Sequence, residues 1–117
     1  YALVDSSNIQ NTKFMRAELS GASFRSAILE NVQFTYARAH GTDFSKAHVL
    51  ECDFGRASLT SADFRASDLT GTTFYFADVH LAKFGRALGI SPTTFLTDTF
   101  SLAVSTHTTS GLFFPPL

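Results

Sequence analysis

An apolar side chain occupies every fifth position of this chain, from Val4 to Phe84, without a polar exception. Two residues before each of these central positions stands a small residue, most often alanine, and only Val32 is larger. A period of five suits neither regular element, because residues five apart lie about 140° from one another on an α-helix and point to opposite faces of a flat strand. The chain must turn once in every five residues, which predicts a solenoid whose repeats bury their apolar sides by stacking.

A second period indicates how many sides the solenoid has. From Phe14 to Phe84, phenylalanine takes every second central position, and aliphatic residues, with one alanine, take the positions between them. Four repeats per coil would stack ring on ring, whereas three repeats per coil would stack rings on aliphatic side chains. Aromatic rings pack well in offset stacks, so we expect two opposite columns of rings in the core. One column comprises Phe14, Phe34, Phe54 and Phe74, and the other comprises Phe24, Phe44, Phe64 and Phe84.

The repeat unit resembles that of the pentapeptide-repeat family, roughly Ala, then Asp or Asn, then Leu or Phe, then two variable residues. The clearest matches include Ala62–Asp63–Phe64 and Ala77–Asp78–Val79, and the resemblance covers about residues 2–88. It implies a right-handed quadrilateral β-helix, which agrees with four repeats per coil. We therefore expect an all-β solenoid of a little over four coils. Lys13 and Lys83 are among the residues that replace Asp or Asn, which weakens the local turn chemistry but leaves the interior intact.

The repeat pattern ends after Ala87, because the next central positions hold Gly89 and Thr94. We therefore divide the chain into a β-helical domain, residues 1–88, and a C-terminal capping segment, residues 89–117. An open solenoid end would expose a layer of rings and unpaired strand edges, so a cap is physically required there.

The C-terminal segment begins with Ser91 and Pro92, a pair typical of a helix start. We expect a short helix that closes the last coil. The apolar tail either folds back onto this cap or docks on a second chain, which would give a homodimer. The candidate cap or interface residues are Phe95, Phe100, Leu112, Phe113 and Phe114.

Charge and hydropathy narrow the classes of partner. Nine Lys and Arg residues nearly balance ten Asp and Glu residues, and the formal net charge is −1. This balance does not indicate the concentrated positive charge that direct binding of nucleic acid requires. No stretch approaches the roughly 18–20 apolar residues of a membrane helix. We expect a soluble protein, cytoplasmic by default, with no membrane span and no direct contact to nucleic acid.

No set of side chains predicts catalysis. His40 and His80 fall two coils apart on one column, about 10 Å, which is too far for one metal ion. His48 falls beside Asp68, one coil further on, and we interpret the two as a surface ion pair because no nucleophile accompanies them. Cys52 occupies a small inward position and is expected to be an inert core thiol. We expect no enzyme, no catalytic or metal-binding residue, no cofactor and no small-molecule substrate.

The outward residues, wrapped at four repeats per coil, include one aromatic and basic face. Arg16, Tyr36, Arg56 and Phe76 fall on one column, where cations and rings would alternate in a cation–π ladder. Exposed clusters of this composition mark protein interfaces, although surface rings can also merely cover the corners of a small rod. The candidate protein-binding face, including two residues of the neighbouring column, comprises Met15, Arg16, Tyr36, Arg56, Tyr75 and Phe76.

Four cations, Arg25, Lys46, Arg65 and Arg86, form a weak basic stripe on the opposite side. The net charge near zero favours its interpretation as a solvated face.

Three functions are compatible with these observations. The leading hypothesis is a non-enzymatic scaffold that binds an unknown protein partner through the candidate face. The family resemblance implies two alternatives: a DNA mimic that occupies type II topoisomerases such as gyrase, giving quinolone resistance or toxin immunity, and a secreted bacterial effector. DNA mimicry needs a strongly negative surface, which the charge balance does not indicate.

Overall fold

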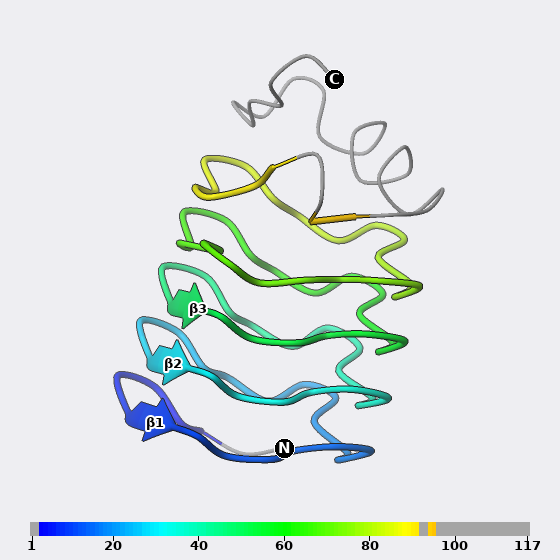
Figure 1. The fold of residues 1–117 in the computed structure, drawn as a ribbon, viewed down its shortest axis with the longest axis horizontal. Coiled ribbons are helices and arrows are strands. Elements are labelled where there is room, and N and C mark those ends of the chain that lie inside the picture. Colours follow the sequence, from blue (N-terminus) through cyan, green and yellow to red (C-terminus); the bar gives the residue numbers. More distant parts are fainter. Residues whose placement is uncertain (1–2, 92–93, 96–117) are drawn as a thin grey trace.

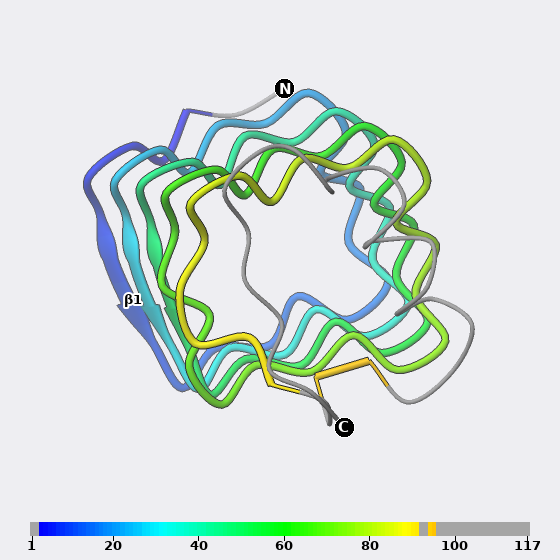
Figure 2. The same ribbon diagram turned by 90° about the horizontal axis from the view of Figure 1, so that it is seen from above.

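The computed structural model describes residues 3–91 and 94–95, which wind into a solenoid of stacked coils (Figure 1). Three short strands lie side by side along one side of it and form a parallel sheet in the order β1-β2-β3. These strands are β1 (Asn8–Gln10), β2 (Ile28–Glu30) and β3 (His48–Leu50). Looking along the solenoid, Figure 2 shows successive coils that surround a common interior.

Neighbouring coils pair at a constant offset along the chain. Within the sheet, Leu29 pairs with Ile9 on one neighbouring strand and with Val49 on the other. Isolated parallel bridges on the remaining sides connect residues with the same offset, such as Asp43 with Asp63. This offset equals four of the five-residue repeats, so each coil contains four repeats. The prediction of a β-helical solenoid that stacks like residues on like is confirmed.

A tight turn follows most of the central residues. In the repeat that starts at Phe14, the amide of Ala17 donates a hydrogen bond of 3.0 Å to the carbonyl of Phe14, and the backbone at Arg16 has a φ of 60°. Positive φ recurs at every position two residues after a central residue, from Ser6 to Arg86. This is the geometry of a type II turn, whose third residue needs left-handed backbone. The left-handed residue in every described repeat bends the chain there, also where this hydrogen bond is absent, as after Leu29, and each central side chain therefore points inward.

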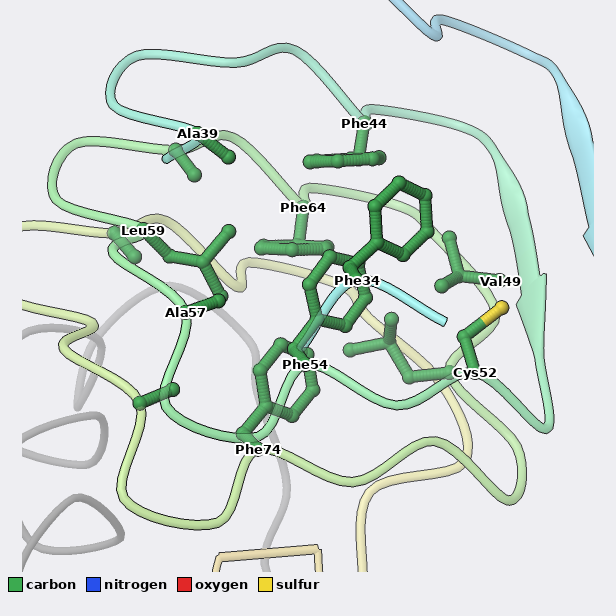
Figure 3. Close-up of a cluster of buried hydrophobic side chains, with 14 of the residues drawn as sticks. Phe34, Ala39, Phe44, Val49, Cys52, Phe54, Ala57, Leu59, Phe64 and Phe74 are labelled. Atoms are coloured by element: carbon green, nitrogen blue, oxygen red, sulfur yellow. The ribbon is translucent and has the colours of Figure 1, made fainter. Parts of the chain in front are cut away.

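The phenylalanine rings fill the interior (Figure 3), and each ring from Phe24 to Phe84 is at most 1% exposed. Within a column the rings are nearly parallel, and the centroids of Phe34 and Phe54 lie 4.6 Å apart at an interplanar angle of 2°. Between columns the rings meet edge to face, as Phe44 and Phe54 do at 5.4 Å and 84°. Both arrangements are favourable for the aromatic quadrupole. The two columns expected from the sequence are therefore present, and they also contact each other across the interior.

One ring column continues past the end of the repeat pattern. Phe95 is buried and its ring stacks on Phe74, with centroids 5.1 Å apart, at an interplanar angle of 17°. The step from Phe74 to Phe95 is one residue longer than the regular offset of four repeats. The sequence favours Phe95 for a helix, but its backbone in the structure is irregular and its ring forms the next layer of the core.

Most of the C-terminal segment lies outside the described residues. This applies to the remaining candidate cap or interface residues and to the position of the expected helix start. These residues are Pro92, Phe100, Leu112, Phe113 and Phe114.

Candidate protein-binding face

The left-handed turn positions of one corner place Arg16, Tyr36, Arg56 and Phe76 one above another. Their φ values lie between 57° and 60°. Backbone hydrogen bonds hold successive coils together at this corner, because the amide of each of the first three residues donates to a carbonyl on the next coil. For Tyr36 this bond is 3.0 Å long. The side chains of the column are therefore held at the spacing of one coil.

The side chains of this corner form two stacked pairs of a cation and a ring. The guanidinium carbon of Arg16 lies 4.7 Å from the centroid of the Tyr36 ring, and that of Arg56 lies 4.6 Å from the centroid of Phe76. The rings stay accessible, since Tyr36 is 47% exposed and Phe76 is 59% exposed. At exposed sites such a pair contributes about 0.5–1 kcal/mol. The column expected as a cation–π ladder is therefore two separate pairs, and the structure, which describes all four residues, contains no cation–π contact between Tyr36 and Arg56.

The neighbouring column adds apolar surface to the same corner. Met15 is 51% exposed and Tyr75 is half-buried, so both present apolar atoms beside the stacked pairs. These two residues complete the set of six named from the sequence.

A shallow groove of about 520 Å³ runs along the other flank of the stacked pairs. Its lining residues are Arg16, Glu18, Tyr36, Ala37, Arg38, Arg56 and Ser58. Arg38 and Glu18 approach to 3.8 Å across it, but both side chains are highly exposed, so this ion pair contributes little to stability. The six residues named from the sequence do not include Glu18, Arg38 and Ser58, although the four-repeat offset places these three on one column, two positions after the column of Arg16 and Arg56.

The interpretation of His48 and Asp68 as an ion pair is wrong. The two residues do pair across neighbouring coils. The structure, which describes both residues, contains no ion pair between them; instead the Asp68 carboxylate accepts hydrogen bonds from the amide and the hydroxyl of Thr70, at 3.1 and 2.6 Å. Aspartate commonly bonds the backbone two residues further on, and this local turn satisfies the carboxylate.

Cys52 lies in the core as expected, with a side chain that is 1% exposed. Its Sγ donates hydrogen bonds of 3.4 Å to the carbonyls of Leu29 and Leu50. Burial raises the pKa of the Cys52 thiol to about 11, and hydrogen bonds to the backbone of Val32 and to the Thr72 hydroxyl offset only part of that effect. A thiol in this state is neutral at physiological pH and therefore a poor nucleophile.

The described part of the chain contains no candidate metal-binding site. Within it, no group of three or more His, Cys, Asp or Glu side chains is arranged to hold a metal ion. The described residues likewise include no helix that is long and apolar enough to cross a membrane.

The four-repeat register, the turn in each repeat and the stacked rings together define a β-helical repeat protein. The family model described as a pentapeptide repeat region matches residues 7–85, which is more than half of the chain. The chain therefore belongs to the pentapeptide-repeat family, as its sequence resemblance implies.

Solved structures of other repeat proteins are similar to this chain. A pentapeptide repeat protein from the thylakoid lumen of Arabidopsis thaliana is 18% identical, with 74% of this chain and 60% of that chain covered and a TM-score of 0.36. Rfr23 from the cyanobacterium Cyanothece 51142 is 13% identical, with 83% and 88% covered and a TM-score of 0.31. HetL from the cyanobacterium Nostoc sp. strain PCC 7120, a protein involved in the regulation of heterocyst differentiation, is 16% identical, with 80% and 71% covered and a TM-score of 0.31.

This chain spans only about 60% of the length of the Arabidopsis protein. No curated protein is similar enough to give a match. At these identities and TM-scores the likenesses carry no argument about function.

Proposed function

We propose that this protein is a non-enzymatic scaffold that binds a protein partner through the candidate protein-binding face. The observation that carries the proposal is the pair of exposed rings, Tyr36 and Phe76, each held under an arginine at one corner of a rigid solenoid. Tyrosine, arginine and other large side chains of this kind supply most of the binding energy in protein interfaces.

The position of these rings supports binding rather than stability as their role. At positive φ, glycine and asparagine are favoured, because the Cβ of other residues lies too close to a carbonyl oxygen and this costs roughly 1–2 kcal/mol, whereas glycine has no Cβ and asparagine can hydrogen-bond locally. Tyr36 and Phe76 occupy such positions and remain about half exposed, so they bury little apolar surface in return. A protein partner that covers the rings would supply the burial that the fold itself does not.

Rigidity also favours the proposal. The backbone amides of Arg16, Tyr36 and Arg56 donate hydrogen bonds of 3.0, 3.0 and 2.8 Å to the next coil, which hold the coils together. The two guanidinium groups lie over the rings without a partner present. Ordering flexible side chains on binding costs about 0.5–1.5 kcal/mol for each one. A surface that is already ordered avoids part of that cost.

The test is capture of partners from the native source with a ring-deleted variant, Tyr36→Asn with Phe76→Asn. Asparagine tolerates left-handed backbone, so the turns are retained while both rings are removed. The matched control is Leu81→Asn with Leu88→Asn, which removes two apolar side chains that are 57% and 65% exposed and do not belong to the face.

We expect a protein that the wild type and the control retain equally and that the ring-deleted variant retains at least tenfold less, measured by quantitative mass spectrometry. Equal retention of every captured protein by the ring-deleted variant would refute the face.

The finer description of the fold belongs to the same proposal. We infer a right-handed quadrilateral β-helix of a little over four coils, with residues 89–117 as a cap or as a contact between two copies. Light scattering of the full chain distinguishes the monomer from the homodimer.

The DNA-mimic alternative receives no support from the surface of the described residues. Such mimicry needs negative charge along the solenoid, and the corner opposite the candidate face carries Arg25, Lys46, Arg65 and Arg86 instead. A supercoiling assay with gyrase and a quinolone tests it directly, and protection of the enzyme by this protein would revive that alternative.

A further inference from the structure

A second groove, of about 380 Å³, lies on the corner opposite the candidate face. Its lining residues are Arg25, Ser45, Lys46, Arg65, Ala66, Gly85 and Arg86. Lys46 is two repeats from Tyr36 and two repeats from Arg56 along the chain. Two repeats are half of a four-repeat coil, so the corner with Lys46 and the corner of the candidate face point away from each other.

Each of four successive coils contributes one cation and one small residue to this corner. The residue pairs are Arg25–Ser26, Ser45–Lys46, Arg65–Ala66 and Gly85–Arg86. The cation therefore alternates between the two positions of the corner, and the small partner leaves room beside it. At about 4.8 Å per coil, the four charges extend over roughly 14 Å along the solenoid.

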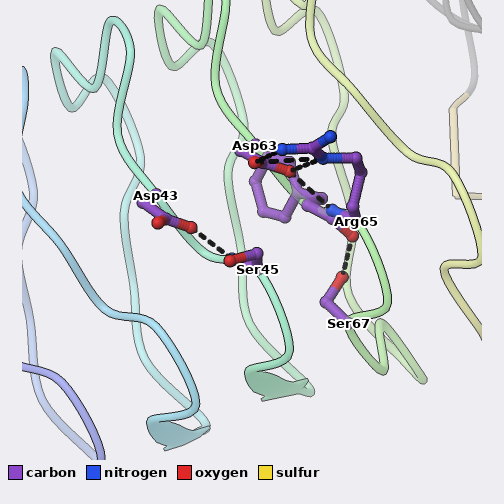
Figure 4. Close-up of polar contacts among 6 residues, drawn as sticks. Asp43, Ser45, Asp63, Arg65 and Ser67 are labelled. Carbon is purple, nitrogen blue, oxygen red and sulfur yellow. Dashed lines mark hydrogen bonds and ion pairs between the residues drawn. The ribbon is translucent and has the colours of Figure 1, made fainter.

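One of these cations already holds a carboxylate (Figure 4). The guanidinium of Arg65 donates to Asp63 through Nε at 3.0 and 3.2 Å and through Nη2 at 2.7 Å. Burial by itself raises the pKa of Asp63, but the hydrogen bonds and charge of Arg65, with the charge of Lys83, outweigh it and keep the pKa below its usual value. The corner thus stabilises one ionised carboxylate at hydrogen-bonding distance from Arg65.

The other three cations of the corner have no such carboxylate within the described part of the chain. Among the residues that the structure describes, the only basic side chains in ion pairs are Arg38 and Arg65, so Arg25, Lys46 and Arg86 have no carboxylate partner there. The nearby Asp43 is occupied by its own turn, where its Oδ1 accepts from the amide of Ser45 at 2.8 Å. Like charges in a row repel one another, and an anionic ligand along the row would relieve that repulsion.

We propose that this basic corner is a second binding site, which takes an extended acidic segment of a protein partner. An extended chain rises about 3.3 Å per residue, so roughly five residues span the row, and their alternate carboxylates face the cations. Guanidinium and carboxylate groups form the strong paired hydrogen bonds that Arg65 and Asp63 display.

The charges beside the row favour carboxylates on a narrow peptide over a nucleic acid. Asp43 and Asp63 flank the cations on one side, and the formal net charge of the chain is −1. A nucleic-acid backbone carries closely spaced phosphates and needs a broad positive surface, which these carboxylates interrupt. The proposal is independent of the candidate face, and the two sites together would let one solenoid bridge two proteins.

The probe is a fluorescein-labelled octapeptide in which Glu and Ser alternate, followed by fluorescence anisotropy at low salt. The variant is Lys46→Asn with Arg86→Asn, which removes two charges but keeps a residue that tolerates left-handed backbone. The control is Lys13→Asn with Arg38→Asn, which changes the net charge by the same amount on other columns. Circular dichroism verifies that both variants retain the fold.

We expect saturable binding to the wild type that weakens as salt rises. The Lys46 and Arg86 variant should bind about tenfold more weakly, as expected for two lost surface ion pairs, and the control should bind like the wild type. The Tyr36→Asn and Phe76→Asn variant should also bind normally, which separates this proposal from the proposed function.

Three results would overturn the proposal. They are the absence of saturable binding to the wild type, an equal loss in the two charge variants, and tighter binding of an octameric oligothymidylate than of the peptide.

Discussion

The rings of Phe74 and Phe95 stack at a centroid distance of 5.1 Å, although the chain between them is one residue longer than in every other step of that column. The backbone pairing shifts with the ring. The amide of Phe54 donates to the carbonyl of Thr73, which directly precedes Phe74, and the amide of Phe74 donates to the carbonyl of Thr94, which directly precedes Phe95. The register between the last two coils thus slips by one residue, and because of this slip one more ring lies over the open end of the column.

Replacement of Phe95 by alanine should loosen the end of the solenoid. The change removes the ring that covers Phe74, at a cost of roughly 3 kcal/mol for a buried phenylalanine. Because each coil contacts only its neighbours, the loss should stay local. Native-state hydrogen exchange should show faster exchange of the Phe74 amide and unchanged exchange of the Phe34 amide. Exchange of the Phe74 amide at the wild-type rate would contradict the capping role, and Phe76→Ala serves as a control in the same coil.

Replacement of Phe54 by alanine should affect the whole domain. Its ring is fully buried and stacks on Phe34 and Phe74, so the free energy of unfolding should fall by about 3–5 kcal/mol. Phe76→Ala provides the comparison, because that ring is 59% exposed, and its loss should cost no more than about 1 kcal/mol. Urea denaturation measures both changes, and similar costs for the two variants would be inconsistent with a core built on stacked rings.

Two glycines with positive φ should respond differently to alanine. Gly41 has a φ of 65° and open space where a Cβ would stand, so Gly41→Ala should cost only the strain of left-handed backbone, about 1 kcal/mol. Gly89 has a φ of 78°, and a Cβ there would lie 2.5 Å from the backbone nitrogen of Thr70, so the backbone itself must shift. Gly89→Ala should therefore lower the unfolding midpoint clearly further than Gly41→Ala. Equal midpoints would show that the last coil adapts freely.

The Cys52 thiol should make stability depend on alkaline pH. Its pKa is raised to about 11 in the folded chain from an ordinary value of 9.0, so the folded state favours the neutral thiol. The resulting contribution to stability is fully present below pH 9 and is lost progressively between about pH 9 and pH 11 as the thiol of the unfolded chain ionises.

The measurement is the difference in unfolding free energy between the wild type and Cys52→Ala across this range, since lysine and tyrosine titration cancels in the difference. The advantage of the wild type should be constant well below the ordinary thiol pKa and should shrink as the pH approaches the raised pKa. A difference that does not change with pH would place the thiol in contact with solvent.

The family, the four repeats per coil and the membership of each column follow from the sequence alone. The reason is geometric: with a turn in every repeat and like residues recurring at every second repeat, only one winding places Phe34 between Phe14 and Phe54. The same offset assigns Arg16, Tyr36, Arg56 and Phe76 to one corner before any side chain is positioned.

Only the tertiary structure decided which neighbours those side chains contact. The Asp68 carboxylate accepts from Thr70 in its own turn rather than from His48. The donors of Thr70 are two residues away, so this contact does not require a side chain of a second coil to be ordered. The step from Phe74 to Phe95 is one residue longer than the period, so periodicity could not predict that Phe95 joins the column. The basic stripe becomes a groove because small residues alternate with the cations along four coils, which the formal charge of the whole chain does not reveal. Periodicity determines the side on which a residue lies, whereas hydrogen bonds and packing between coils determine what it touches there.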